Sequence, residues 1–235
     1  MGSILLAFGI DAWWDELGER EFERVTLIDL REDFQGHIET IHEFQKRSLS
    51  RVDAADILLA SSGRSKPEIS DDLLLQALNR MHIWKQLLIP EGTLASLLEG
   101  QGLSVIQSAA LRTALVEWTQ QLKMVDETNL YMIEVVMHLE GYLSTRFPTR
   151  ALRLIAEQSN PPPDGTTSIG PTSFPAHVRP LLLEMEFENH VVRGRDASHI
   201  GLIQSELWAA SARRVIELID QELGPIDRDT GQEAQ

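Results

Sequence analysis

The chain has 235 residues, no cysteine, and a formal net charge of −15 that arises from 21 basic and 36 acidic side chains. The lack of cysteine excludes a disulfide framework, thiolate metal ligands and cysteine catalysis. The acidic balance disfavours nucleic acid as a partner, because phosphate contacts require a basic surface. Hydrophobic residues make up 43% of the chain and aromatic residues only 6%, which favours a globular helical protein over a sheet protein.

An apolar segment over residues 4–10 opens the chain, and two tryptophans follow it. The segment is shorter than the about 20 residues that a membrane span needs, and it lacks the basic start and cleavage site of a signal peptide. It is typical of the second half of a span, with the tryptophans at interfacial depth. We therefore predict a partial, truncated membrane anchor or stalk over residues 1–18, against the alternative of an apolar helix start packed on the core. The predicted membrane-interface residues are Ile4, Leu5, Leu6, Phe8, Ile10, Trp13 and Trp14.

Helical spacing continues to about residue 60 and predicts one long first helix, with the apolar residues Val25, Ile28, Phe34, Ile38, Ile41, Leu49, Val52 and Ile57. Ser70, followed by two aspartates, predicts the N-cap of a second helix that runs through Trp84 and ends before proline 90. Thr93 is the expected N-cap of a short third helix that ends at glycine 100.

Residues 108–147 hold the strongest pattern, in which apolar residues recur at alternating steps of four and three. Ser108 as the N-cap and the proline after Phe147 predict one uninterrupted helix. At 1.5 Å per residue it would be roughly 60 Å long, against about 45 Å across a compact globule of this chain length. We therefore predict an all-α, elongated bundle of about five to six helices, with this long central helix.

Asn129 lies within the apolar stripe of the long helix, where a buried amide can fix the register or the partner of a helix interface. It is our candidate for helix-interface specificity. The alternative is an amide near the rim that bonds a neighbouring helix or water.

The region after the long helix is rich in proline and glycine. Residues 148–175 read as a loop, either a binding lid or a solvated linker, with a short helical piece at 151–156. Two C-terminal helices are predicted at about 177–192 and 197–223, with a turn at Gly194 and Arg195. Residues 19–224 would form the bundle domain and 225–235 a disordered tail.

No pattern of catalytic residues is apparent. The Glu-x-x-His spacing of a bundle di-metal site occurs once, at Glu39 and His42, whereas such a site needs it on two helices. Glu134 and His138 are four apart, one turn of a helix, and do not provide the second copy. We expect no cofactor, no metal site and no enzymatic activity.

Residues 3–32, 93–106 and 111–118 together resemble an uncharacterised bacterial family of single-span, membrane-anchored helical proteins of unknown function. The resemblance implies one N-terminal span and a helical soluble domain, with no assigned enzyme activity. The flank after the apolar segment carries few basic residues, which argues that this side is not cytoplasmic. Taken together, these features predict a protein of the bacterial inner membrane whose soluble domain is periplasmic.

Beside a least favoured third alternative, a metal-dependent enzyme built on the bundle interior, two functions remain open at this point. The first is a non-enzymatic, membrane-associated interaction or scaffold subunit that docks a protein partner, or a second copy of itself, through helix faces. The second is a soluble sensory or small-ligand-binding helical module, in which the 148–175 loop acts as a lid over a cleft.

Overall fold

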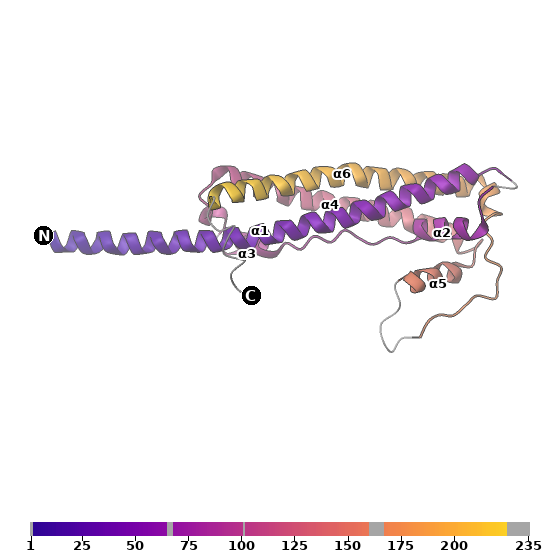
Figure 1. The fold of residues 1–235 in the computed structure, drawn as a ribbon, viewed down its shortest axis with the longest axis horizontal. Helices are drawn as coiled ribbons and strands as arrows, with labels where there is room; N and C mark the ends of the chain where they lie inside the picture. The colour runs from indigo at the N-terminus through magenta and orange to yellow at the C-terminus, as the bar shows by residue number, and fades with distance from the viewer. Residues whose placement is uncertain (1, 65–67, 101, 160–166, 225–235) are drawn as a thin grey trace, which may run out of the picture. The chain divides into compact units, whose positions relative to one another are not determined.

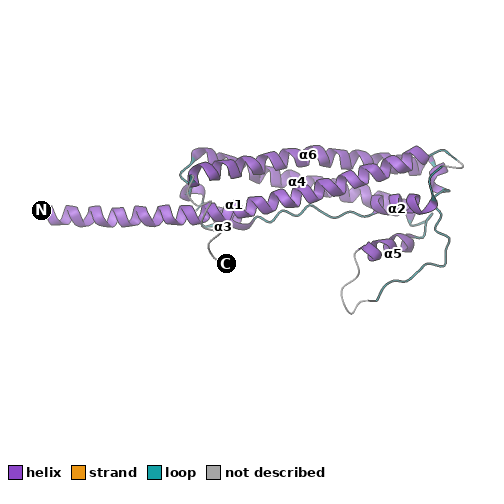
Figure 2. Ribbon diagram, in the orientation of Figure 1, coloured by secondary structure: helices purple, strands orange, loops and turns teal. Residues whose placement is uncertain are grey.

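The computed structural model describes residues 2–64, 68–100, 102–159 and 167–224, with side chains placed from residue 17 onward except that of residue 159. Six α-helices and two short 3-10 helices make up its secondary structure, and this part of the chain contains no strand (Figures 1 and 2). The predicted all-α helical bundle is confirmed. The helices are α1 (Gly2–Ser61), α2 (Asp71–His82), α3 (Gly92–Glu99), α4 (Ala109–Leu143), α5 (Thr149–Ser159) and α6 (Met185–Leu223), with η1 at Leu103–Val105 and η2 at Leu181–Leu183.

Two predicted helix starts are confirmed at the level of their caps. The Leu73 backbone N–H donates to the Ser70 hydroxyl at 3.3 Å, and the Leu111 N–H donates to the Ser108 hydroxyl at 3.4 Å. The predicted stripe of α4 also lies against the core: all its members are buried or half-buried. The helix ends at Leu143, four residues before the predicted end, and a turn leads on to Phe147.

The apolar residues that predicted α1 do not all share one buried face. Phe34 and Ile41 are fully buried, whereas Val25, Ile28 and Leu49 are about half exposed, at 48%, 46% and 53%. The helical period was read correctly, but apolar residues occur on two adjacent faces of α1. Only the packed neighbours select one of them.

The two predicted C-terminal helices form one continuous helix, α6, and Gly194 lies inside it rather than in a turn. A Cβ atom on Gly194 would stand 2.5 Å from the Met81 methyl carbon. The glycine therefore serves close packing of α2 on α6 instead of chain reversal. Arg195, the other residue of the predicted turn, donates from Nε to the Asp56 carboxylate at 2.6 Å.

The second and third helices also depart from their predicted limits. α2 stops at His82, well before proline 90, and residues 83–91 run without helix. Thr93 lies within α3 rather than capping it. Its backbone N–H donates to the Asp33 carboxylate of α1 at 2.7 Å. The predicted helical piece at 151–156 is confirmed as part of α5.

The chain divides into two compact units, and the predicted bundle domain of residues 19–224 spans both. Unit 1 comprises residues 1–42, 88–123 and 207–235. Its core contains Phe34 and Trp118, whose ring centroids lie 5.1 Å apart, and the Trp118 indole stacks at 11° on the His37 imidazole. The predicted disordered tail lies outside the described residues.

Unit 2 comprises residues 43–87 and 124–206. Its main core is a cluster of buried apolar side chains from α1, α2, α4, α5 and α6, together with η2. Leu152 anchors α5 in that cluster with no exposed surface. The segment of the predicted 148–175 loop that folds as α5 is therefore part of the packed unit.

Candidate functional site

Arg51 is buried in unit 2 by its position on α1. The residues at steps of four and three around it, Phe44, Ser48, Ala55 and Leu58, are all buried. Arg51 shares their face of the helix and is only 4% exposed. The local helical period therefore carries a guanidinium group into the interior of the unit.

The Arg51 guanidinium closes the end of α2. Its Nη1 donates to three backbone carbonyl oxygens, those of Arg80 at 3.1 Å, Met81 at 2.7 Å and Ile83 at 2.7 Å. Its Nε donates to the Ser198 hydroxyl of α6 at 3.3 Å. The last carbonyls of a helix lack partners within the helix and carry partial negative charge, so a cation is a suitable cap.

The charge of Arg51 nevertheless has no carboxylate partner among the described residues, and its Nη2 makes no hydrogen bond within them. Burial lowers the pKa of the Arg51 guanidinium to about 10, because desolvation disfavours the charged form. A buried charge normally requires a partner of opposite sign. Arg51 thus keeps one donor nitrogen that no described protein group accepts, and no described carboxylate neutralises its charge.

Trp84 forms an apolar wall beside this charge. The Arg51 guanidinium carbon lies 5.7 Å from the centre of the Trp84 indole, within the range of a cation–π contact. The indole in turn meets the Phe44 ring edge-on, with centroids 5.6 Å apart. The non-helical chain after α2 places Trp84 here.

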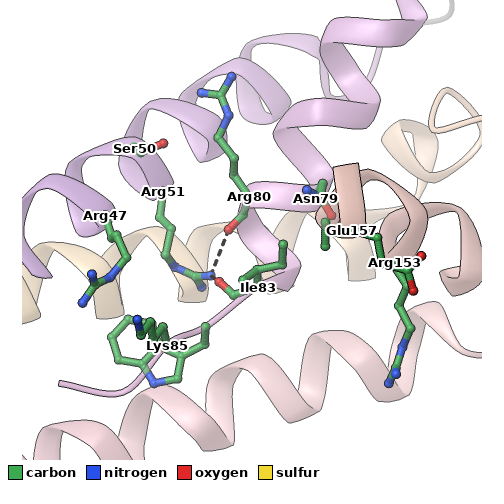
Figure 3. Close-up of a pocket in the computed structure, with 11 residues that line it drawn as sticks. Arg47, Ser50, Arg51, Asn79, Arg80, Ile83, Lys85, Arg153 and Glu157 are labelled. Atoms are coloured by element: carbon green, nitrogen blue, oxygen red, sulfur yellow. Dashed lines mark hydrogen bonds between the residues drawn. The ribbon is translucent and has the colours of Figure 1, made fainter. Parts of the chain in front are cut away.

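A pocket of about 590 Å³ opens in front of Arg51, and we call it the Arg51 pocket. Its walls come from α1, from the end of α2, from residues 83–85 and from α5. Figure 3 shows Arg47 and Arg51 projecting from successive turns of α1, while the Arg80 side chain extends away and contributes its carbonyl oxygen. Five cationic residues and one carboxylate line it: Arg47, Arg51, Arg80, Lys85 and Arg153, with Glu157.

A second pocket of about 350 Å³ adjoins the first, because both are lined by Ile83, Trp84, Arg153 and Ala156. Its further lining is mainly apolar and comes from α4 and α5: Ile133, Val136, Met137 and Leu152. The positive charges of Arg153 and Arg51 also act on His82, which lines the second pocket. Burial lowers the pKa of that imidazole, and Arg153 and Arg51 lower it further, against the opposing charge of Glu140.

Asn129, predicted as a helix-interface residue, is buried at 6% exposure. Its amide pairs with the backbone of Leu87: the Leu87 N–H donates to Oδ1 at 3.0 Å, and Nδ2 donates to the Leu87 carbonyl at 2.8 Å. Both polar atoms thus hold the chain between α2 and α3, rather than a second helix. A role in specificity stays a prediction.

The remaining predicted sites are not gathered in one place. The side chains of the predicted membrane-interface residues 4–14 lie outside the described part of the structure. Nε2 of His42 lies 3.3 Å from Nη2 of Arg213, and His138 faces Glu134 at 4.0 Å. Among the described side chains, no group of three potential ligands is close enough to hold a metal ion.

Sequence reasoning missed the Arg51 pocket. One signal was available: Arg51 occupies the same helical stripe as Phe44 and Leu58, and a charged residue in such a stripe requires explanation. The other cations came from segments that are distant in sequence. Only the packing of α5 against α2 brings Arg153 to the same pocket.

Along the described residues, none of the helices combines the length and the apolar character needed to cross a bilayer. No known protein family, curated protein or solved structure matches the chain. The resemblance to a membrane-anchored helical family therefore stays a prediction, and the argument about function rests on the geometry of the two units.

Proposed function

We propose that unit 2 is a small-ligand-binding module and that the Arg51 pocket is its binding site. The observation that supports this most directly is Arg51, a buried cation with an unfilled donor at the wall of a pocket of about 590 Å³. Ligand sites of about 300–1,000 Å³, with a few polar groups on mostly apolar walls, are typical of small-molecule binding. This is the second of the two functions that the sequence left open.

α5 acts as the cover of the site in this proposal, and residues 168–170 brace it. The Arg150 guanidinium donates to the carbonyl oxygens of Ile169 and Gly170, the latter at 3.1 Å. The Ser168 hydroxyl donates to the Glu157 carboxylate at 2.5 Å. The segment thus restrains both ends of α5, in addition to the packing of Leu152 in the core.

The proposal is tested by filling the pocket from α5. Ala156 lines both adjoining pockets, so Ala156→Trp should occupy the space without removing any polar contact. A thermal-shift screen of small acids, amines and neutral compounds on the full chain should find stabilising compounds that act on the unaltered protein and fail on this variant. Gln158→Trp, at an exposed position of the same helix, is the matched control. Equal responses of all three proteins would overturn the assignment.

The membrane-associated interaction subunit remains a second candidate, supported by an observation on unit 1. Phe22, Val25 and Ile28 follow one another at steps of three on α1, and each is exposed by nearly half. An apolar strip next to the apolar start of the chain suits contact with a membrane or a protein partner. The inner membrane with a periplasmic soluble domain is the location proposed for it.

Flotation of the full chain with vesicles of phosphatidylethanolamine and phosphatidylglycerol tests this second candidate. We expect the protein to float with the vesicles, and Val25→Glu to reduce the bound fraction. Thr113→Glu, at an exposed position of α4 in unit 1, controls for the added charge. Protein that stays at the bottom of the gradient would leave the strip without a membrane role.

A further inference from the structure

We infer that the ligand of the Arg51 pocket is an organic phosphate, whose phosphate group is held by Arg51, Arg47 and Lys85 and whose apolar body lies against Trp84. This inference rests on the binding function proposed above. It adds the chemical class of the ligand, which the existence of a pocket does not define.

The charge of the pocket is the first argument. Five of its lining residues are cationic and one is anionic, in a chain whose net charge is −15. Among the described residues, no ion pair neutralises Arg51, Lys85 or Arg153, and the nearest carboxylate oxygen to Arg47 belongs to Glu43 at 3.9 Å. Like charges that outnumber their counter-charges repel, so a bound anion relieves a cost that the protein otherwise retains.

The origin of the donors on separate segments of the chain is the second argument. Arg47 and Arg51 come from successive turns of α1, and Lys85 comes from the non-helical chain after α2 (Figure 3). A phosphate monoester presents three terminal oxygens and a charge of about −1.5 to −2 at neutral pH, so it accepts from several directions at once. A carboxylate offers two oxygens in one plane, which suits a single arginine fork better than donors on separate segments.

The apolar surface is the third argument. Trp84 separates the cationic pocket from its apolar neighbour, which Ile133, Val136 and Met137 line from α4. An inorganic phosphate would use the first space and leave the second empty. A phosphate joined to an aromatic or aliphatic body fills both, and stacking on the indole adds affinity.

Isothermal titration of the full chain with four probes tests the inference: phenyl phosphate, inorganic phosphate, benzoate and benzylamine. Phenyl phosphate should bind at least about tenfold more tightly than inorganic phosphate, because apolar contact is added, and more tightly than benzoate. Added salt should weaken its binding, and benzylamine should not bind. Tighter binding of benzylamine, or of benzoate, would overturn the phosphate assignment.

Substitutions locate the phosphate group. Arg47→Met and Lys85→Met should each weaken phenyl phosphate about tenfold, the loss expected for one charge-assisted hydrogen bond. Lys46→Met removes an exposed charge one residue from Arg47, outside the pocket lining, and should change binding by less than about twofold. Trp84→Leu should weaken the binding of phenyl phosphate but leave the binding of inorganic phosphate unchanged. If Lys46→Met and Arg47→Met lowered the affinity for phenyl phosphate equally, the binding would depend on the general surface charge and not on a phosphate site at Arg47.

The Ala156→Trp variant separates the two proposals. A neutral or cationic compound whose binding this variant abolishes would contradict the phosphate class while leaving the pocket as a binding site. Phenyl phosphate that binds the unaltered protein and this variant equally would place the phosphate elsewhere and refute both. Binding that is lost in Ala156→Trp and weakened in Arg47→Met supports both.

Discussion

Two regions of the molecule use one electrostatic arrangement and differ in what they leave open. In unit 1 the Asp33 carboxylate of α1 accepts the Thr93 N–H at 2.7 Å, so an anion caps the N-terminus of α3. In unit 2 the Arg51 guanidinium of the same helix donates to carbonyls at the end of α2, so a cation caps a C-terminus. Each charge complements the partial charge of the helix end that it meets.

The difference lies in the hydrogen-bonding capacity that remains. Asp33 is half-buried and meets solvent at α3, a short helix that has no cap from its own residues. Arg51 is buried, keeps an Nη2 that no described protein group accepts, and lines a pocket together with Arg47, Lys85 and Arg153. The first contact is complete as a helix cap, whereas the second satisfies the backbone and still leaves charge for a ligand. A structural role and a binding role can therefore reside in one side chain.

Arg51→Met should produce the largest change, because it removes the cation and leaves three carbonyl oxygens without their donor. At about 1 kcal/mol for each orphaned acceptor, we expect a loss of about 3 kcal/mol in the free energy of unfolding. Urea unfolding measures it, with Lys46→Met as the exposed control, which should stay within about 0.5 kcal/mol. A gain in stability would mean that the cost of burying the charge outweighs its caps, and the comparison with Asp33 would fail.

The cap in unit 1 is tested at Gly92, which adopts a φ of +49°. A Cβ there would stand 2.4 Å from the Asp33 carboxylate oxygen. Gly92→Ala should therefore lower the free energy of unfolding by about 2 kcal/mol, because it strains the backbone and displaces the cap. Gly36→Ala is the matched control: Gly36 lies inside α1 with no atom within 4 Å of an added Cβ, so alanine should stabilise by about 1 kcal/mol. Equal free energies of unfolding for the two variants, measured by chemical denaturation, would contradict the role of Asp33 as the cap of α3.

The smallest expected effect is on the pH dependence of stability, to which His37 of unit 1 contributes. Its Nε2 donates to the Pro90 carbonyl at 2.7 Å, and its buried Nδ1 has no partner within the described residues. Burial lowers the pKa of His37 below its ordinary value of 6.5, against the raising effects of the Pro90 carbonyl and the Asp33 charge. The unfolded chain then binds a proton that the native chain does not, so stability should fall as the pH drops below 6.5.

Unfolding midpoints measured from about pH 7.5 down to about pH 5 check this direction. His37→Gln keeps a donor for the Pro90 carbonyl and should flatten the profile. His42→Gln, an exposed histidine on the same helix, should leave it unchanged. A profile that His37→Gln does not alter would assign the pH dependence to other histidines, such as His82, whose pKa burial also lowers.

The sequence by itself determined the helical class, the long α4 with its buried stripe, and the caps at Ser70 and Ser108. These features depend on local spacing and on side chains that bond their own helix ends, so neighbours in sequence suffice to predict them. The same local reading placed a turn at Gly194, because glycine signals both chain reversal and close packing. It also grouped Val25 and Ile28 with Phe34 and Ile41, since helical period alone does not say which of two apolar faces is covered.

Only the tertiary structure decided where α2 ends and what lies beyond it. The chain after His82 leaves the helix because Arg51 satisfies its carbonyls and Asn129 satisfies both backbone groups of Leu87. Those partners lie 30 to 42 residues away in the sequence. The departure from helix brings Trp84 and Lys85 to the pocket, and α5 supplies Arg153. Long-range hydrogen bonds therefore made the candidate site, and no local pattern encodes them.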